Sequence, residues 1–134
     1  CVACAAFVCA ETWAAAALAY DDEDGTLGYG IGTDKATSKA AAIQDCENNG
    51  ATVPKFWFWH QGPGWGASAF SDDGGGAWTI GGALSYTTKK KAKRKAKKQC
   101  KESGGINCQI VDVFRDTVGK KTKKGGKSFH LTSD

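Results

Sequence analysis

Histidine is scarce in this sequence, and its two copies are not placed as metal ligands usually are. His60 and His130 have no partner at helical spacing and no cysteine at zinc-ligand spacing. Zinc sites in proteins need three or four protein ligands. The sequence therefore predicts no metal site and no cofactor.

The motifs by which enzymes bind nucleotides or activate nucleophiles are also missing. The run Gly-Tyr-Gly-Ile-Gly at 28–32 lacks the last glycine and the strand-to-helix setting of a dinucleotide site. No serine lies in a nucleophile elbow. Cys1 and Cys4 have redox spacing without the strand and helix of redox proteins, which favours a structural disulfide. We therefore expect a protein that is not an enzyme.

The acidic run before Gly25 does not complete a calcium loop. Such a loop requires an acid where Tyr20 stands and a glutamate at its twelfth position. An exposed hairpin turn is favoured, and its carboxylates form a candidate acidic face for a partner. These residues are Asp21, Asp22, Glu23 and Asp24.

The sequence has no long, strongly hydrophobic run. The first twenty residues are mostly apolar, but many are alanine and Glu11 interrupts them, so no membrane span is predicted. Six cysteines in 134 residues favour a disulfide framework and an oxidising compartment. The start at Cys1 is typical of an export signal already removed, although cleavage after Ala10 is an alternative. We expect a secreted or cell-surface protein.

An internal repeat organises the chain. Each copy has a tryptophan in an apolar run, an acidic glycine turn, a glycine-rich strand and a helix that ends in cysteine. The separation from Trp13 to Cys46 is 33 residues, and that from Trp65 to Cys100 is 35. Turns of aspartate and glycine between apolar runs predict hairpins. Each copy is therefore predicted to be β-β-α-β.

The expected fold is α+β. Two β-β-α-β repeats share a mainly antiparallel sheet, the helices cover one face, and disulfides hold the helix ends. We predict one domain over 1–134, with an apolar segment at 1–11, repeat 1 at 12–61, repeat 2 at 62–117 and a basic tail at 118–134. A short edge strand within the tail, around Ser128–Leu131, is an open possibility.

Small residues at helical spacing predict how both helices meet the sheet. In the second helix Ala92, Ala96 and Cys100 recur every four residues after a cap at Thr87 or Thr88. In the first helix the predicted contact residues are Ala36, Ala40, Ile43 and Cys46, with a cap near Thr33 or Asp34 and an Asn-Asn-Gly stop. Seams this small, over glycine-rich strands, predict close packing of helix on sheet.

Residues 12–116 resemble the bacterial family called domain of unknown function 4189. The shared features are the tryptophan before small apolar residues, the Gly-Tyr-Gly strand and the alanine-rich helix ending in cysteine. The resemblance implies an exported or cell-envelope protein without established catalytic residues. It also implies that Cys100 pairs with Cys108. Pro54 and Lys55 stand near the matching place in repeat 1, so Cys46 is expected to pair with Cys4 or Cys9, while Cys1 closes locally with the cysteine left over or bridges to another chain.

Aromatic residues alternate before the second repeat. Strand periodicity puts Phe56, Phe58 and His60 on one face and Trp57 and Trp59 on the other. A central strand covered on both faces is the favoured interpretation. The alternative is a partly exposed tryptophan strip that contacts sugar, peptidoglycan or a partner, with Trp57, Trp59 and Trp65 as candidates.

Charge divides the chain into two halves. Residues 11–60 hold eight acids and three bases, and residues 65–134 hold fifteen bases and six acids. The leading hypothesis is a non-enzymatic structural or interaction protein that self-associates into an oligomer or filament through these halves. One alternative is a module that binds an anionic polymer, nucleic acid or acidic polysaccharide; another is a secreted inhibitor or effector of another protein. The candidate contact residues for the polymer are Lys89, Lys90, Lys91, Lys93, Arg94, Lys95, Lys97, Lys98 and Lys101.

Overall fold

The computed structural model describes residues 15–61, 64–72, 77–116 and 126–133. Within them the order β-β-α-β occurs twice and one more strand follows, as the repeat predicts. The edge strand considered for the tail is present as β7. The elements are β1 (Ala15–Asp21), β2 (Leu27–Gly32), α2 (Lys35–Asn48), β3 (Pro54–Gln61), β4 (Gly64–Asp72), β5 (Trp78–Tyr86), α3 (Lys89–Glu102), β6 (Gln109–Asp116) and β7 (Lys127–Thr132).

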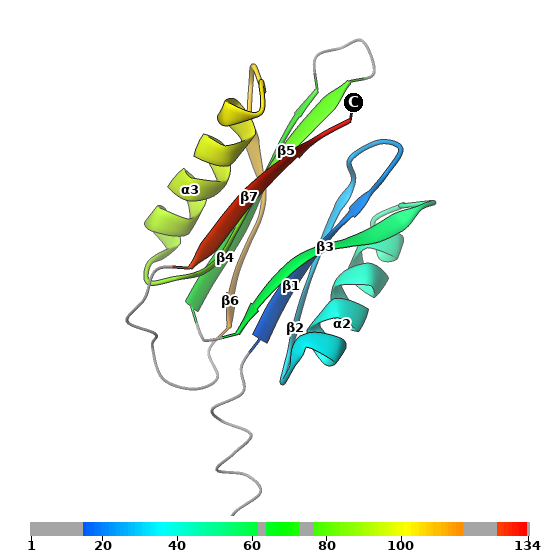
Figure 1. Ribbon diagram of the computed structural model, residues 1–134, viewed down its shortest axis with the longest axis vertical. Helices are drawn as coiled ribbons and strands as arrows, with labels where there is room; N and C mark the ends of the chain where they lie inside the picture. Colours follow the sequence, from blue (N-terminus) through cyan, green and yellow to red (C-terminus); the bar gives the residue numbers. More distant parts are fainter. Residues whose placement is uncertain (1–14, 62–63, 73–76, 117–125, 134) are drawn as a thin grey trace, which may run out of the picture.

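The strands form two sheets, where one shared sheet was expected. The first has the order β2-β1-β3 and the second the order β6-β4-β5-β7, and all pairings are antiparallel. The sheets lie face to face, and each helix covers the outer face of the sheet of its own repeat (Figure 1). The α+β class and the repeated β-β-α-β order are confirmed, and the single sheet is corrected to two.

The reason for two sheets is that each repeat has a second apolar face. Leu18, Phe58, Leu84 and Phe114 form a buried cluster between the sheets. A single sheet with helices on one side would leave this face in water, at a cost of about 25 cal/mol per Å² of apolar surface. Packing the two faces against each other removes both from solvent.

Helix α2 follows the predicted start and stop but not the predicted contact face. Asp34 is the N-cap, and its carboxylate accepts a hydrogen bond from the Thr37 backbone N–H at 2.8 Å. Gly50 takes the expected left-handed conformation after the helix, with φ +104°. The buried residues are Ser38, Ala42 and Cys46.

The expected seam of α2 through Ala36 and Ala40 is therefore wrong, because both residues are exposed. Spacing backward from the buried Cys46 in steps of four leads to Ala42 and then to Ser38, whose hydroxyl donates to the Asp34 carbonyl at 2.8 Å. The hydrogen bond removes the cost of burying this polar side chain.

Helix α3 forms as predicted. Thr88 is the N-cap, its hydroxyl accepts from the Lys91 N–H at 3.1 Å, and Ala92, Ala96 and Cys100 are the buried face. Both helices lie directly on glycine. A Cβ atom on Gly81 would collide with the backbone of α3, and one on Gly28 with the backbone of α2. In the part of the chain that the structure describes, neither helix is long and apolar enough to cross a membrane.

Strand β3 corrects the expected division of its aromatic residues. The register between β1 and β3 shifts between Leu18, which pairs with Phe58, and Ala19, which pairs with Phe56. Trp57 is the extra residue of this bulge, and a bulge breaks the alternation of faces. Trp57 and Phe58 both lie in the layer between the sheets, whereas Phe56 and Trp59 pack under α2. The strand is also an edge strand rather than a central one.

A disulfide joins Cys100 at the end of α3 to Cys108 just before β6, as the family resemblance implies. The bond spans a sequence separation of 8 residues. Loop-closure entropy for a ring of this size predicts a contribution of about 2.5 kcal/mol to the free energy of unfolding.

Removing this bond is expected to destabilise the protein by that amount. We predict that Cys108→Ala and Cys100→Ala each lower the free energy of unfolding by about 2.5 kcal/mol, measured by urea denaturation. Because both remove the same bond, the double variant should lose little more than either single variant. Additive losses would mean that the bond is not what the substitutions remove.

Candidate functional site

The outer face of α3 carries the longest run of basic residues in the described parts of the chain. Nine of its fourteen residues are lysine or arginine, and all except Lys91 and Lys95 are exposed. Within the described residues the only salt bridge joins Lys55 Nζ to Asp22 Oδ2 at 3.4 Å, far from this helix in the sequence. The basic charges of α3 thus have no carboxylate within salt-bridge distance in that part of the chain.

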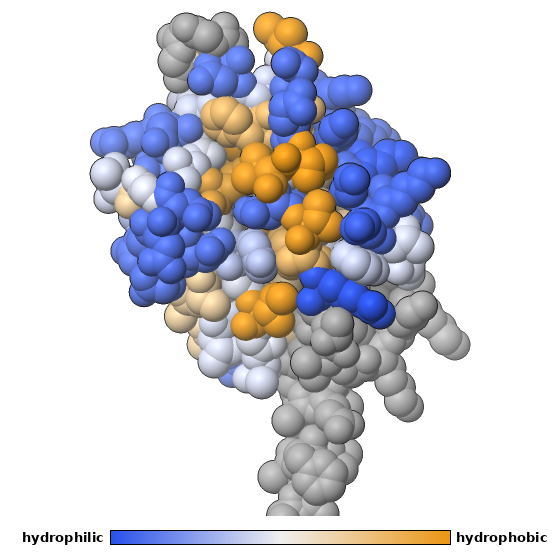
Figure 2. Space-filling view, turned by 180° about the vertical axis from the view of Figure 1, so that it is seen from behind, coloured by the Kyte–Doolittle hydropathy of each residue, from blue (hydrophilic) through white to orange (hydrophobic). Residues whose placement is uncertain are grey.

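The buried seam of α3 explains this one-sided charge. Ala92, Ala96 and Cys100 take every position that faces the sheet, so all the lysines must point sideways or outward. Lys90, Arg94, Lys97 and Lys101 follow one another along one exposed stripe at helical spacing. Seen from behind, the flank of the molecule where α3 lies is hydrophilic (Figure 2).

Trp65 lies next to basic side chains and is not part of the tryptophan strip considered as an alternative. Two cations lie over its ring, with Lys89 Nζ 5.8 Å and the Arg115 guanidinium carbon 5.3 Å from the ring centroid. Trp57 lies between the sheets and Trp59 packs under α2. The structure therefore does not bring the three predicted tryptophans together, because the bulge in β3 separates two of them and the third lies on the other sheet.

The predicted acidic face loses its first member. Asp21 is only 1% exposed, and its carboxylate accepts backbone N–H groups of Glu23 at 2.7 Å and Thr52 at 2.8 Å. Burial opposes ionisation, but these and further backbone hydrogen bonds outweigh it, so the pKa of Asp21 is lowered. Asp21 is a structural carboxylate. The exposed acids of the turn are Asp22, Glu23 and Asp24.

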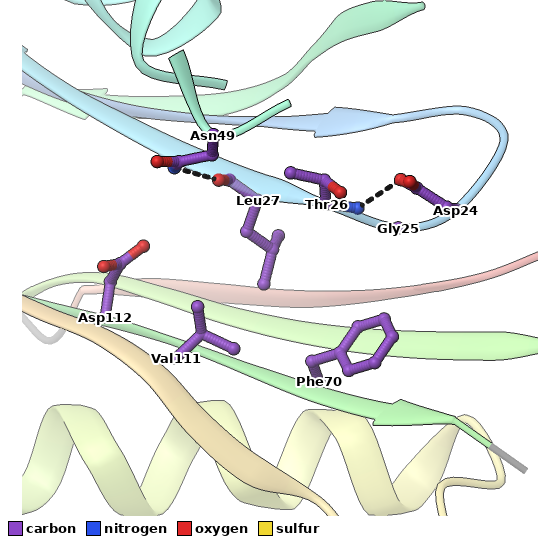
Figure 3. A pocket seen from close by; sticks show the side chains of 8 residues that line it. All are labelled: Asp24, Gly25, Thr26, Leu27, Asn49, Phe70, Val111 and Asp112. Carbon is purple, nitrogen blue, oxygen red and sulfur yellow. Dashed lines mark hydrogen bonds between the residues drawn. The ribbon is translucent and has the colours of Figure 1, made fainter. Parts of the chain in front are cut away.

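A groove opens between the two sheets on the side where β2 and β6 lie. It has a volume of about 390 Å³. In Figure 3, Leu27 points from β2 across the groove toward Val111 and Phe70 on the facing sheet. Figure 2 looks onto this side and shows hydrophobic residues gathered between two hydrophilic flanks. The groove is lined by Asp24, Gly25, Thr26, Leu27, Asn49, Phe70, Val111 and Asp112.

The groove carries an acid with an altered pKa. Asp112 is half-buried, and burial together with the charge of Asp45 raises the pKa of its carboxyl group. Asp45 itself lies on α2, where its carboxylate accepts the Tyr29 backbone N–H at 3.0 Å. Asp112 therefore places negative charge at one end of the groove and Asp24 at the other, and apolar side chains of Leu27, Phe70 and Val111 lie between them.

Cys46 carries a free thiol, so its expected pairing with Cys4 or Cys9 is corrected. Its sulfur is completely buried under α2 and donates a hydrogen bond to the Thr26 carbonyl at 3.4 Å. Burial, reinforced by the charges of Asp21 and Asp45, raises the pKa of the thiol to about 11. Pro54 occupies the position that Cys108 has in repeat 2.

The two histidines do not meet. His60 is half-buried on β3, where burial and the charge of Lys127 lower its pKa, and His130 is exposed on β7, with Nδ1 2.8 Å from Gln99 Oε1. The described residues contain no group of three or more His, Cys, Asp or Glu side chains arranged to hold a metal ion. Cys1, Cys4, Cys9 and most of the basic tail lie outside the described residues.

The sequence did not reveal the groove. Its apolar lining comes from three strands of two different sheets, and the predicted single sheet contained no space between layers. The alternation of Val111, Asp112 and Val113 predicts that the two valines share one face of β6 and that Asp112 lies on the other. A bulge at Val111 shifts the register, so this alternation does not hold at Asp112.

A family model described as Domain of unknown function (DUF4189) matches residues 65–132, just over half of the chain. The matched residues include α3, the disulfide and β7. No curated protein and no solved structure matches the chain.

Proposed function

Because the chain belongs to the family described as Domain of unknown function (DUF4189), whose name assigns no activity, we propose a function from its surfaces: it is an exported, non-enzymatic interaction protein that binds anionic polymers through α3. The observation that carries the proposal is the row of basic side chains on the outer layer of the fold, with no acid partner within salt-bridge distance in the described part of the chain. The disulfide supports export.

The geometry of α3 suits a linear polymer. A helix of 14 residues is about 21 Å long at a rise of about 1.5 Å per residue. The exposed stripe through Lys90, Arg94, Lys97 and Lys101 runs along this length. Such a stripe contacts several successive charges of a polyanion and releases their counterions. Contacts to the charged backbone of a polymer carry no sequence information, so we propose charge recognition without sequence preference.

The proposal is tested by the salt dependence of binding to a DNA duplex used as a defined polyanion. We expect the logarithm of the binding constant to fall steeply with the logarithm of the salt concentration. The triple variant Lys90→Gln, Lys97→Gln and Lys101→Gln should reduce that slope by about 2.7 and weaken binding about tenfold or more at low salt.

A matched control removes equal charge from the other repeat. Lys35→Gln, Lys39→Gln and Lys55→Gln also neutralise three exposed lysines, and this variant should keep the slope of the wild type. A salt-independent binding constant, or an equal effect of the two triple variants, would contradict recognition by α3.

Self-association is a second candidate, favoured by the separation of charge between the repeats. Asp22, Glu23 and Asp24 are exposed at the β1–β2 turn, while α3 presents only bases on its outer face apart from Glu102. A contact between the turn of one copy and α3 of the next is heterologous and therefore builds rings or filaments. Light scattering at low and high salt, with and without reductant, distinguishes this assembly from a monomer.

A further inference from the structure

Strand β7 shows how this fold accepts an added strand. It pairs with the outer edge of β5, so that Leu131 lies opposite Ile80 and Phe129 opposite Gly82. Leu131 packs against a second buried cluster, formed by Leu27, Trp78 and Ile80. The ring of Phe129 contacts that of Phe58, with centroids 4.8 Å apart. The added strand lies beside β5, on the side of the molecule where β3 lies (Figure 1).

Repeat 1 has a corresponding strand edge at β2, and none of the described strands pairs with it. Strand pairing makes β2 the counterpart of β5, β1 that of β4 and β3 that of β6, and the same bulge occurs in β3 and in β6. The residues that share a cluster with Leu131 include Tyr20 of β1, Trp57 of β3, and Trp78 and Ile80 of β5. The counterparts of these four are Phe70, Val111, Gly25 and Leu27, and all of them line the groove between β2 and β6.

Two side chains at the end of α2, that of Asp45 in the helix and that of Asn49 just after it, hydrogen-bond to the edge of β2 where a strand would pair. Asp45 accepts the Tyr29 N–H at 3.0 Å, and the Asn49 side chain donates to the Leu27 carbonyl at 2.8 Å (Figure 3). The carbonyl and N–H groups of an incoming strand can replace both bonds. In repeat 2 the counterpart of Asp45 is Gln99, which contacts β7 through Ser128 Oγ at 3.0 Å and His130 Nδ1 at 2.8 Å.

The edge of β5, which β7 occupies, and the edge of β2 differ in the charge beside them. Phe58, which contacts Phe129 of β7, corresponds to Asp112 in the groove. Within the described residues no basic side chain lies within salt-bridge distance of Asp112. Displacement of Asp45 from Tyr29 would leave a second carboxylate at the same end. The position that holds Phe129 in β7 therefore requires a basic residue in this groove.

We propose that the groove between β2 and β6 binds an extended segment of a partner protein, which adds to β2 as a strand. The segment places an apolar side chain opposite Leu27, where it fills the space between Phe70 and Val111. It places a lysine or arginine two residues earlier, opposite Tyr29, where it pairs with Asp112. Backbone hydrogen bonds to an exposed strand edge give such a segment affinity, and the two side chains give it specificity.

Two synthetic peptides test this proposal. One has the sequence of residues 126–133, and the other has the same sequence with Phe129→Lys. Each is titrated into the whole protein while backbone amide signals are followed by nuclear magnetic resonance. We expect the lysine peptide to shift signals of Leu27, Tyr29 and Ile31 in a saturable way, with at least about tenfold higher affinity than the phenylalanine peptide.

Variants of the groove show whether Asp112 sets this preference. Asp112→Asn should remove the preference for the lysine peptide, and Asp112→Phe should reverse it, because phenylalanine restores the contact that Phe58 makes in the other repeat. Val111→Lys should abolish binding of both peptides while the rest of the spectrum stays unchanged, since Val111 is 48% exposed.

Three results would overturn the proposal. One is the absence of saturable shifts with either peptide. Another is shifts confined to Ile80–Leu84, which would mean that the peptide only exchanges with β7. The third is a peptide-independent dimer in light scattering whose interface covers Leu27 and Val111, because a second copy would then be the occupant of the groove.

Discussion

Gly81→Val is expected to destabilise the protein by about 3 kcal/mol, or roughly 10 °C in Tm. A Cβ atom at this position would collide with the Ala96 carbonyl and the Cys100 backbone nitrogen. Neither is the end of a flexible side chain, so the whole of α3 must move away from the sheet. This movement would open a gap between the helix and the sheet, and the small side chains of Ala92 and Ala96 could not fill it.

Gly28→Val should have a similar effect in repeat 1, since a Cβ atom there meets the backbone of Cys46 and Ala42. Thr132→Val is the matched control, because it also introduces valine into a strand but at an exposed position of β7, and it should change stability by less than about 0.5 kcal/mol. Thermal unfolding measures all three. A stability of Gly81→Val within 1 kcal/mol of the wild type would show that the helix is not seated on the glycine.

Asp21→Ala is expected to lower the free energy of unfolding by about 3 kcal/mol at neutral pH. The substitution removes an ionised acceptor and leaves the N–H groups of Glu23 and Thr52 without it. The hydrogen bonds from these N–H groups to Asp21 hold the β1–β2 turn and the connection from α2 to β3 in place. Asp22→Ala is the control: its carboxylate is half exposed and paired with Lys55, so its loss should cost less than about 1 kcal/mol.

The effect of Asp21→Ala should depend on pH. Because the pKa of Asp21 is lower in the folded protein, its contribution is fully present above the pKa of the unfolded chain and is lost as pH falls through the folded value. Urea denaturation between pH 7 and pH 2 should therefore show the wild type and the variant converging in acid. A difference that stays constant with pH would mean that the ionised carboxylate is not the stabilising group.

Repeat 2 suggests a partial rescue for the same position. Ser71 is the counterpart of Asp21, and its hydroxyl accepts the backbone N–H groups of Ile106 at 3.2 Å and Asn107 at 3.4 Å. Asp21→Ser should therefore be more stable than Asp21→Ala and should lose the acid dependence.

The local elements could be predicted from the sequence because their signals are local. Thr88 as a cap, the spacing of Ala92, Ala96 and Cys100, and the glycine stop after α2 are each contained within one helix. The disulfide between Cys100 and Cys108 followed from the family pattern. In α2 the buried face could not be identified because it includes the polar Ser38. The sequence does not distinguish a buried serine, bonded to the preceding turn, from an exposed one.

The number of sheets and the groove could not be predicted in this way, because they depend on which faces meet. Trp57 and Val111 are bulge residues, and each shifts the following side chains to the face that strict alternation does not assign. The burial of Asp21 likewise depends on Thr52, 31 residues away, which no local pattern connects to it. Sequence reasoning therefore located the basic helix correctly, but it placed the buried Asp21 in the acidic face and assigned the aromatic residues of β3 to the wrong faces.

The placement of α2 and α3 on opposite outer faces determines the valency of the molecule. Among the described residues only the face of α3 is strongly basic, so a copy that binds polyanions as proposed would hold one anionic chain there. The groove between β2 and β6 opens between the two sheets, whereas α3 covers the outer face of its own sheet. A copy that binds a polymer through α3 as proposed would leave the groove accessible to solvent. It would therefore act as an adaptor that binds a polyanion at α3 and a peptide segment at the edge of β2.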